Sequence, residues 1–446
     1  MGTTFELYLD AVFPNILTAI SDPKDMVRDA AVSTLKRIMA NFTNYAIKKA
    51  LPSFLAQLET DNWRSKMSTV EALGNMAYCA PKQISSFLPQ IVKGLREVMN
   101  DTHEKVHDAA INAIEKIGSV IKCPEVGDML EIIVRALANT EKHLKEALNL
   151  LLETSFVHKI DAPSLSLLVP LLDSGMMMHD NAAKQMAAQL MGNICSLTSD
   201  ASDLLPYMSI LMPAIKNSLF DPIPEIRASS AKAMGSLAKG LGIENSLEML
   251  GWLREFLNSN NIQTNERLGS AQGFAELISA HGIEYFEVNV EEVVIKAKDP
   301  DADVREAYRG VLMFLANSFD HFKDYLPKLV PIMIEGLADE KDEVRKVSMR
   351  NVKVCIKQFG KIAPDMLVMP VMKMMFSFDS RVRASSSILM FSLVKELEND
   401  VIKAQPKYID IDTKHKILSS MFILRHDPIE AVKTQAGQIW KNIIDN

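Results

Sequence analysis

Apolar side chains recur at the spacing of an amphipathic helix over residues 221–242, at Ile226, Ala233, Met234 and Leu237. Asp221 followed by Pro222 predicts the start of this helix, because a carboxylate caps free backbone N–H groups and a proline ring suits the first turn. Gly240 and Gly242 predict its end, since glycine adopts the left-handed cap conformation without steric cost. The stretch is therefore predicted to form one helix with one buried face.

An apolar segment, residues 206–219, precedes this helix and predicts an antiparallel partner helix. The turn between the two carries Asp, then Val or Ile, then Arg, which is typical of a HEAT-type repeat. Related turns recur at intervals of ~40 residues, the range of HEAT and armadillo repeats. They are Asp22–Arg28, Asp61–Arg64, Asp101–His107, Asn139–Lys145, Asp180–Lys184, Asp221–Arg227, Asn265–Arg267, Asp299–Arg305, Asp339–Arg345, Asp379–Arg383 and Asp427–Lys433. The sequence thus predicts an all-α HEAT-repeat α-solenoid of roughly eleven helix pairs.

The recurring acidic and basic residues of these turns have a structural explanation. We expect the Asp to cap the second helix of each pair, and the Arg one turn later to reach the Asp of the adjacent repeat. The last interval is longer, because Glu398–Asp412 intervenes as a predicted insertion between helices. The predicted organisation is therefore a HEAT-repeat array of about ten repeats over residues 1–397, followed by an insertion and a final HEAT-like repeat over residues 398–446.

The amino-acid composition limits the classes of function that are open to this chain. The 446 residues carry a formal net charge of −7, which argues against a general nucleic-acid binder and confines any RNA contact to a local surface. The four cysteines lie far apart without CxxC spacing, which indicates buried thiols in a reducing compartment. The most apolar window, Leu367–Phe378, contains Pro370 and Lys373 and falls short of the ~18 apolar residues of a membrane span. We therefore expect a cytoplasmic protein without membrane contact.

One enzyme motif occurs in the sequence. His103-Glu104-Lys105-Val106-His107 matches H-E-x-x-H, in which two imidazoles one helical turn apart bind zinc. Here the turn of the repeat begins at Asp101, so His107 falls at the position that Arg occupies elsewhere. We interpret the motif as a coincidence of the repeat, with a metalloenzyme as the alternative. Phosphate-loop, G-x-S-x-G and kinase motifs are absent from the sequence. We therefore expect no catalysis, cofactor or small-molecule substrate.

A basic row is the sharpest candidate for a contact surface. Residues 344–361 contain no acidic residue and carry Arg345, Lys346, Arg350, Lys353, Lys357 and Lys361. Lys346, Arg350, Lys353 and Lys357 follow the spacing i, i+4, i+7, i+11 and share one helix face. Such a face suits a phosphate backbone or an acidic protein partner. An ordinary solvated helix face is the alternative interpretation.

Several segments resemble a known family beyond the general repeat pattern. They are residues 62–92, 101–126, 160–165, 192–197, 221–242 and 265–287. Their amino-acid sequences are similar to the central region of the ribosome-associated activators of the initiation-factor-2-alpha kinase in general amino-acid control. That region itself resembles the HEAT domain of fungal elongation factor 3. Family members are several times longer than this chain.

The resemblance implies a scaffold that lies along ribosomes and relays amino-acid starvation or stalling to the kinase. It also implies partnership with an ABC-type ATPase. The kinase-binding part of the family lies downstream of the similar region, so direct kinase binding is not expected of this chain. A general HEAT adaptor for nuclear transport or phosphatase assembly is the alternative function.

Overall fold

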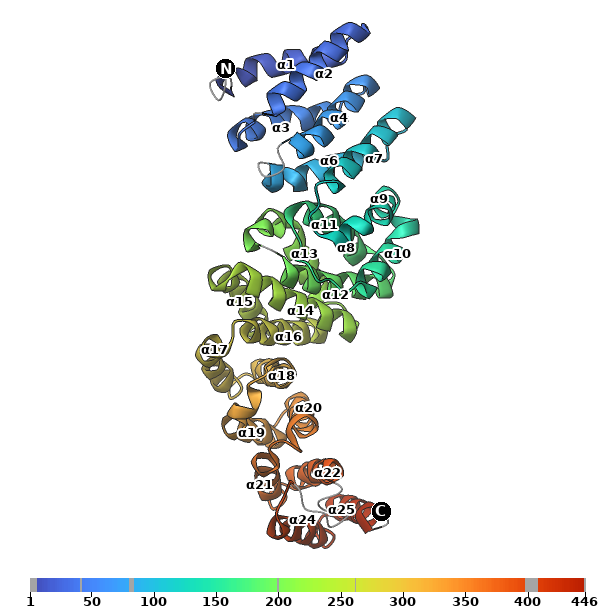
Figure 1. Ribbon diagram of the computed structural model, residues 1–446. Coiled ribbons are helices and arrows are strands. Elements are labelled where there is room, and N and C mark those ends of the chain that lie inside the picture. Colours follow the sequence, from blue (N-terminus) through green and yellow to red (C-terminus); the bar gives the residue numbers. More distant parts are fainter. Residues whose placement is uncertain are drawn as a thin grey trace. The chain divides into compact units, whose positions relative to one another are not determined.

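The computed structural model describes residues 6–40, 42–79, 84–198, 200–260, 262–397 and 408–444. The regular secondary structure of these residues is helical, apart from an isolated bridge between Ile160 and Thr198. The chain divides into two compact units, Met1–Ser218 and Leu219–Asn446. Figure 1 shows that each unit is built from successive helix pairs. The predicted all-α architecture of stacked helix pairs is therefore confirmed.

The first unit contains the helices up to α13. Their bounds are α1 Leu9–Ile20, α2 Asp25–Met39, α3 Asn44–Leu58, α4 Trp63–Cys79, η2 Ser85–Phe87, α6 Leu88–Val98, α7 Glu104–Gly118, α8 Pro124–Asp128, α9 Leu130–Ala138, α10 Thr140–Glu153, α11 Ala162–Met177, α12 Asn181–Leu197, η3 Ala201–Asp203, η4 Leu205–Tyr207 and α13 Met208–Leu219. The second helices of successive pairs pack on one another, as α2 does on α4 and α4 on α7. Gly74 permits the close approach at α4, since a Cβ there would lie 2.9 Å from Ala113 Cα.

The second unit begins at the end of α13. Its helices are α14 Pro224–Leu241, α15 Ile243–Leu257, α16 Thr264–Ala280, α17 Ile283–Lys296, α18 Ala302–Ser318, η5 Phe322–Tyr325, α19 Leu326–Glu335, η6 Gly336–Ala338, α20 Asp342–Phe359, α21 Pro364–Met374, α22 Ser380–Glu396, α24 Ile411–Leu424 and α25 Glu430–Ile444. The second helices α14, α16, α18, α20, α22 and α25 pack in sequence, each on the next. Apolar side chains between neighbouring helices form the core of the unit, which is how repeat arrays stabilise themselves.

The recurring Asp performs a different task from the one expected. Asp221 does not cap α14 directly: its Oδ1 accepts a hydrogen bond of 2.9 Å from the Ile223 N–H, within the turn. The helix begins two residues later than predicted, with Pro224 rather than Pro222 in its first turn. Asp339 makes the same turn with the Lys341 N–H at 3.0 Å. The Asp residues of these turns therefore close the loop before the helix. Asp180 and Asp379, by contrast, are true N-caps.

The Arg of the turn has two partners where the predicted ladder forms. Arg305 donates to the carbonyl of Asp299 in its own turn at 2.9 Å, and to both carboxylate oxygens of Asp339 in the next repeat at 2.8 and 2.9 Å. Arg383 bonds to Asp427 in the same way, at 2.7 and 3.0 Å. The predicted contact between adjacent repeats is therefore present at these positions. Arg345 instead bonds to the Asp339 carbonyl and to Asp342, within its own repeat.

The ends of the predicted elements agree with the structure in part. Gly242 follows the last residue of α14 with φ of 84°, a conformation that favours glycine, whereas Gly240 lies inside the helix. The predicted insertion Glu398–Asp412 lies outside the described residues from 398 to 407. Its last two residues, Ile411 and Asp412, belong to α24. The division at residue 397 stays a prediction.

The described cysteines are buried thiols, as predicted. Cys123, Cys195 and Cys355 are free and buried, and burial raises the thiol pKa of Cys195 and Cys355 to about 12. The side chain of Cys79 lies outside the described residues. Across the described ranges, no helix is both long and apolar enough to cross a bilayer.

Candidate functional site

Helix α20 presents most of the predicted basic row on its outer face, and Lys361 follows the end of the helix. Its other face is fixed by apolar packing, with Val344, Val347 and Cys355 buried among the neighbouring helices. Asn351 anchors the helix to α18, because its Nδ2 donates to the Arg309 carbonyl at 2.7 Å in the buried core. Lys346, Arg350, Lys353, Lys357 and Lys361 are exposed. The buried contacts therefore determine which side of α20 faces solvent.

The six predicted residues differ in their pairing. Arg345 is half-buried and belongs to the turn. Lys346 Nζ lies 2.5 Å from Asp342 Oδ2, and this contact raises the lysine pKa. Lys361 lies 3.7 Å from Glu396 of α22. The acidic first turn of α20 and one carboxylate of α22 thus compensate both ends of the row.

Three cations in the middle of the row remain without a carboxylate. Within the part of the chain that the structure describes, Arg350, Lys353 and Lys357 form no ion pair. They occupy positions i, i+3 and i+7 on one face of α20, so their charges point the same way. The basic face, defined as Arg350, Lys353 and Lys357, is therefore the uncompensated part of the predicted surface. An uncompensated cationic face on an acidic chain attracts a negatively charged partner locally.

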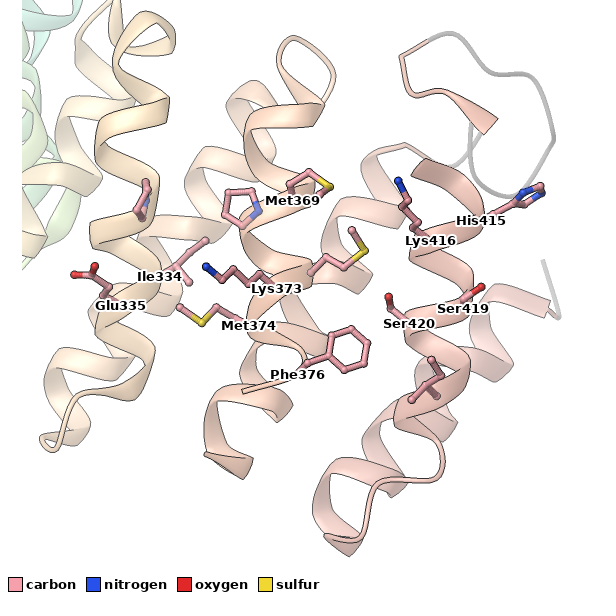
Figure 2. Close-up of a pocket in the computed structure, with 14 residues that line it drawn as sticks. Ile334, Glu335, Met369, Lys373, Met374, Phe376, His415, Lys416, Ser419 and Ser420 are labelled. Atoms are coloured by element: carbon pink, nitrogen blue, oxygen red, sulfur yellow. The ribbon is translucent and has the colours of Figure 1, made fainter. Parts of the chain in front are cut away.

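A second candidate surface is a hollow on the first helices of three successive pairs (Figure 2). It has a volume of about 840 Å³. Its lining consists of Pro331, Ile334 and Glu335 from α19, Met369, Pro370, Met372, Lys373, Met374 and Phe376 on or just after α21, and His415, Lys416, Ser419, Ser420 and Ile423 from α24. We call this hollow the α21 groove. Figure 2 shows Phe376 between α21 and α24, and Lys373 extending from α21 toward α19.

The α21 groove was not predicted from the sequence. The apolar window Leu367–Phe378, which is too short for a membrane span, provides the α21 side of its lining. A buried helix and a half-exposed one carry the same apolar residues, and only the structure shows that Met369 and Phe376 are about half exposed, at 51% each. Phe378, just beyond, is fully exposed. The two phenylalanines that follow the helix end, Phe376 and Phe378, are the signal that could have indicated a surface.

The H-E-x-x-H motif follows the repeat rather than a zinc site. His103 precedes α7 and stacks on Trp63 at 4.2 Å between ring centroids, so it lies outside the helix that the motif requires. His107 Nδ1 lies 2.5 Å from the Met99 carbonyl oxygen, a turn contact like those of the arginines. In the described segments, no cluster of His, Cys, Asp or Glu has the arrangement of a metal site. The two imidazoles therefore contribute to the turn.

Two family models match parts of the chain. Residues 1–114 match the EF3 N-terminal HEAT repeat, and residues 142–248 match the Elongation factor 3/GNC1 HEAT repeat. The HEAT type that the turns predicted is therefore confirmed, together with the fold class.

Curated relatives match over the full chain. The eIF-2-alpha kinase activator GCN1 of Dictyostelium discoideum is 37% identical over 100% of this chain and 18% of its own length. The stalled ribosome sensor GCN1 of Homo sapiens is 35% identical over 100% of this chain and 17% of its own length. Elongation factor 3 of Gonapodya prolifera is 30% identical over 52% of this chain and 22% of its own length. The predicted resemblance is thus confirmed: over its whole length the chain is homologous to a segment of the GCN1 proteins, and in part to the HEAT repeats of elongation factor 3.

Proposed function

We propose that the chain is a non-enzymatic, cytoplasmic HEAT scaffold that binds ribosomes in translational control. The observation that carries the proposal is similarity along the entire chain to proteins named as a stalled ribosome sensor and as eIF-2-alpha kinase activators. The chain spans less than one fifth of the length of these relatives. We expect the chain to bind partner macromolecules and to hold them at set distances from one another, because its stacked helices provide extended surfaces.

The partners follow from the same similarity. A relay of starvation or stalling requires the ribosome on one side and the kinase on the other, with the kinase contact made indirectly. The partial similarity to elongation factor 3 supports an association with an ABC-type ATPase. These partners are macromolecular, in keeping with a repeat array whose neighbouring helices build continuous faces.

We propose the basic face of α20 as the ribosome contact. Arg350, Lys353 and Lys357 are exposed and uncompensated, whereas the chain as a whole has a net charge of −7. Long-range attraction of the whole molecule to RNA is therefore unfavourable, and binding depends on a local cationic row. Ribosomal RNA phosphates or an acidic ribosomal protein would provide the complementary charge.

Co-sedimentation with purified ribosomes across a salt series tests this proposal. The wild-type chain is compared with Arg350→Glu/Lys353→Glu/Lys357→Glu. We expect binding to weaken as salt rises and to be abolished in the triple variant, because each phosphate contact releases counterions. A variant that removes a single phosphate contact should reduce the slope of log affinity against log salt by about one.

A matched control separates a local contact from net charge. Lys36→Glu/Lys142→Glu/Lys239→Glu reverses three exposed lysines on α2, α10 and α14 and changes the net charge equally. Binding by the control together with no binding by the α20 variant supports the contact. Equal weakening in both assigns binding to overall charge, and unchanged binding in both discards the basic face. Absence of ribosome binding at low salt contradicts the scaffold function and leaves the general HEAT adaptor.

A further inference from the structure

The α21 groove continues into a second hollow. That hollow, of about 560 Å³, is lined by residues that include Phe376, Phe378, Ile423 and Ile429. Phe376 and Ile423 line both hollows, so apolar side chains join the two along α21 and α24, while polar residues that include Arg383 and Asp427 also line the second. A contiguous apolar surface of this kind on a soluble protein marks an interaction site, whereas scattered exposed apolar residues do not.

The groove is open rather than enclosed. Met369 and Phe376 are each 51% exposed and Ile423 is 55% exposed. A small ligand seated among half-exposed side chains would leave much of its own surface in water, whereas pockets for small molecules bury most of their ligand. A second protein element covers such a surface better, because it contributes a face of its own side chains.

The dimensions suit an α-helix. Helix α21 has 11 residues, which corresponds to about 16 Å of length and roughly three helical turns. A partner helix that lies along α21 would bring its apolar face over Met369, Met372 and Phe376. Methionine side chains adapt to the shape of their partner, and amphipathic helices dock in grooves of this kind.

The charge of the groove selects an acidic partner. Glu335 is paired with Lys298 at 2.8 Å, and Lys416 with Asp412 at 2.6 Å. The Lys373 side chain is exposed, and among the described residues its ammonium group has no ion pair or hydrogen bond. One uncompensated cation therefore lies on the middle helix of the groove, beside apolar side chains and the two paired charges, where it would favour a carboxylate of the partner.

We propose that the α21 groove binds an amphipathic helix of a partner protein, with apolar residues at positions i, i+3, i+4 and i+7 and a carboxylate that meets Lys373. This contact is independent of the proposed ribosome contact, because the groove lies on first helices of the pairs and the basic face lies on a second helix. A single chain could therefore hold two partners.

Peptide display on the full chain tests the proposal. A library of helix-forming peptides about four turns long is selected against the wild type and against Phe376→Ser/Ile423→Ser. The control Val288→Ser/Ile295→Ser removes two exposed apolar residues from α17, outside the groove. We expect wild type and control to enrich amphipathic sequences with Asp or Glu beside the apolar face, and the groove variant to enrich none. Circular dichroism melting checks that all three chains are folded.

Charge reversal then tests the role of Lys373. An enriched peptide, titrated by fluorescence anisotropy, is expected to bind Lys373→Glu about tenfold more weakly than wild type. The same peptide with Lys in place of the acidic residue is expected to prefer Lys373→Glu. The variant Arg350→Glu/Lys353→Glu/Lys357→Glu should bind the original peptide as the wild type does.

Three results would overturn the proposal. The first is identical enrichment by the wild type and the groove variant. The second is enrichment without acidic residues together with equal affinity for Lys373→Glu. The third is self-association of the wild type, seen by analytical ultracentrifugation and abolished by Phe376→Ser/Ile423→Ser, which assigns the groove to a second copy of the chain.

Discussion

At the scale of single residues, the arginines of the turns show how one side chain joins two repeats. Arg383 Nη1 donates to the carbonyl of Ser377, while its Nε and Nη2 hold the Asp427 carboxylate of the last helix pair. The Asp427 side chain is only 4% exposed, so Arg383 is its main compensation. The neighbouring Arg381 pairs with Asp379 in a largely exposed position. Because only one of these two adjacent ion pairs is buried, we expect them to contribute differently to the free energy of unfolding.

We predict that Arg383→Met destabilises the chain by about 3 kcal/mol, because it leaves a buried carboxylate without its partner. Arg381→Met is the matched control and should cost less than about 1 kcal/mol, as is usual for exposed pairs. Urea denaturation followed by circular dichroism measures both changes. Equal destabilisation by the two substitutions would show that the buried pair of Arg383 and Asp427 stabilises the chain no more than the exposed pair does.

At the scale of elements, glycines determine how closely helices approach. A Cβ on Gly269 of α16 would overlap the carbonyl oxygen of Leu219, which is backbone and cannot rotate away. Gly251 in the middle of α15 has no atom within 4 Å of the corresponding position. Both residues stand inside helices, and the sequence alone does not distinguish them. The packing of α16 therefore makes one glycine necessary and leaves the other replaceable.

We predict opposite effects for the two alanine substitutions. Gly269→Ala should destabilise the chain by about 1–3 kcal/mol through overpacking. Gly251→Ala should stabilise it by up to about 1 kcal/mol, because alanine has the higher helix propensity. Thermal melts of the two variants beside the wild type measure the difference. Stabilisation by Gly269→Ala would contradict the close contact with Leu219.

At the scale of the whole molecule, the carboxyl groups of the turns make the stability of the fold depend on pH. A hydrogen bond from Lys66 lowers the pKa of Asp101 in the first unit, and one from Arg383 lowers the pKa of Asp427 in the second. A carboxyl group with a lowered folded-state pKa binds fewer protons in the folded chain than in the unfolded one. Its stabilisation is therefore complete above the unfolded pKa, about 3.9, and is lost as pH falls toward the folded value.

We predict that the urea midpoint changes little between about pH 7 and pH 5 and falls steeply below about pH 4. The deficit of Asp427→Asn relative to wild type should shrink over the same acid range, since both side chains are then uncharged. Denaturation series at several pH values measure both effects. A deficit that stays constant down to the lowest pH would contradict the lowered pKa of Asp427.

The candidate site was predictable only in part. The row Lys346, Arg350, Lys353 and Lys357 follows from helical spacing, which is local. Which members remain uncompensated depends on Asp342 and Glu396, and the second of these lies on another helix. The α21 groove depends on three helices from separate repeats. Its apolar window was visible in the sequence, but whether Met369 and Phe376 are covered was not.

The sequence by itself determined the helix pairs, their repeat interval and the turns between them, because periodicity and turn chemistry act over a few residues. It also determined the glycine at the end of α14. Only the tertiary structure decided that Arg305 reaches the next repeat while Arg345 does not. Whether an arginine reaches the next repeat depends on the distance between segments that lie more than 30 residues apart in the sequence. The packing of the helices determines that distance, and the local sequence pattern does not.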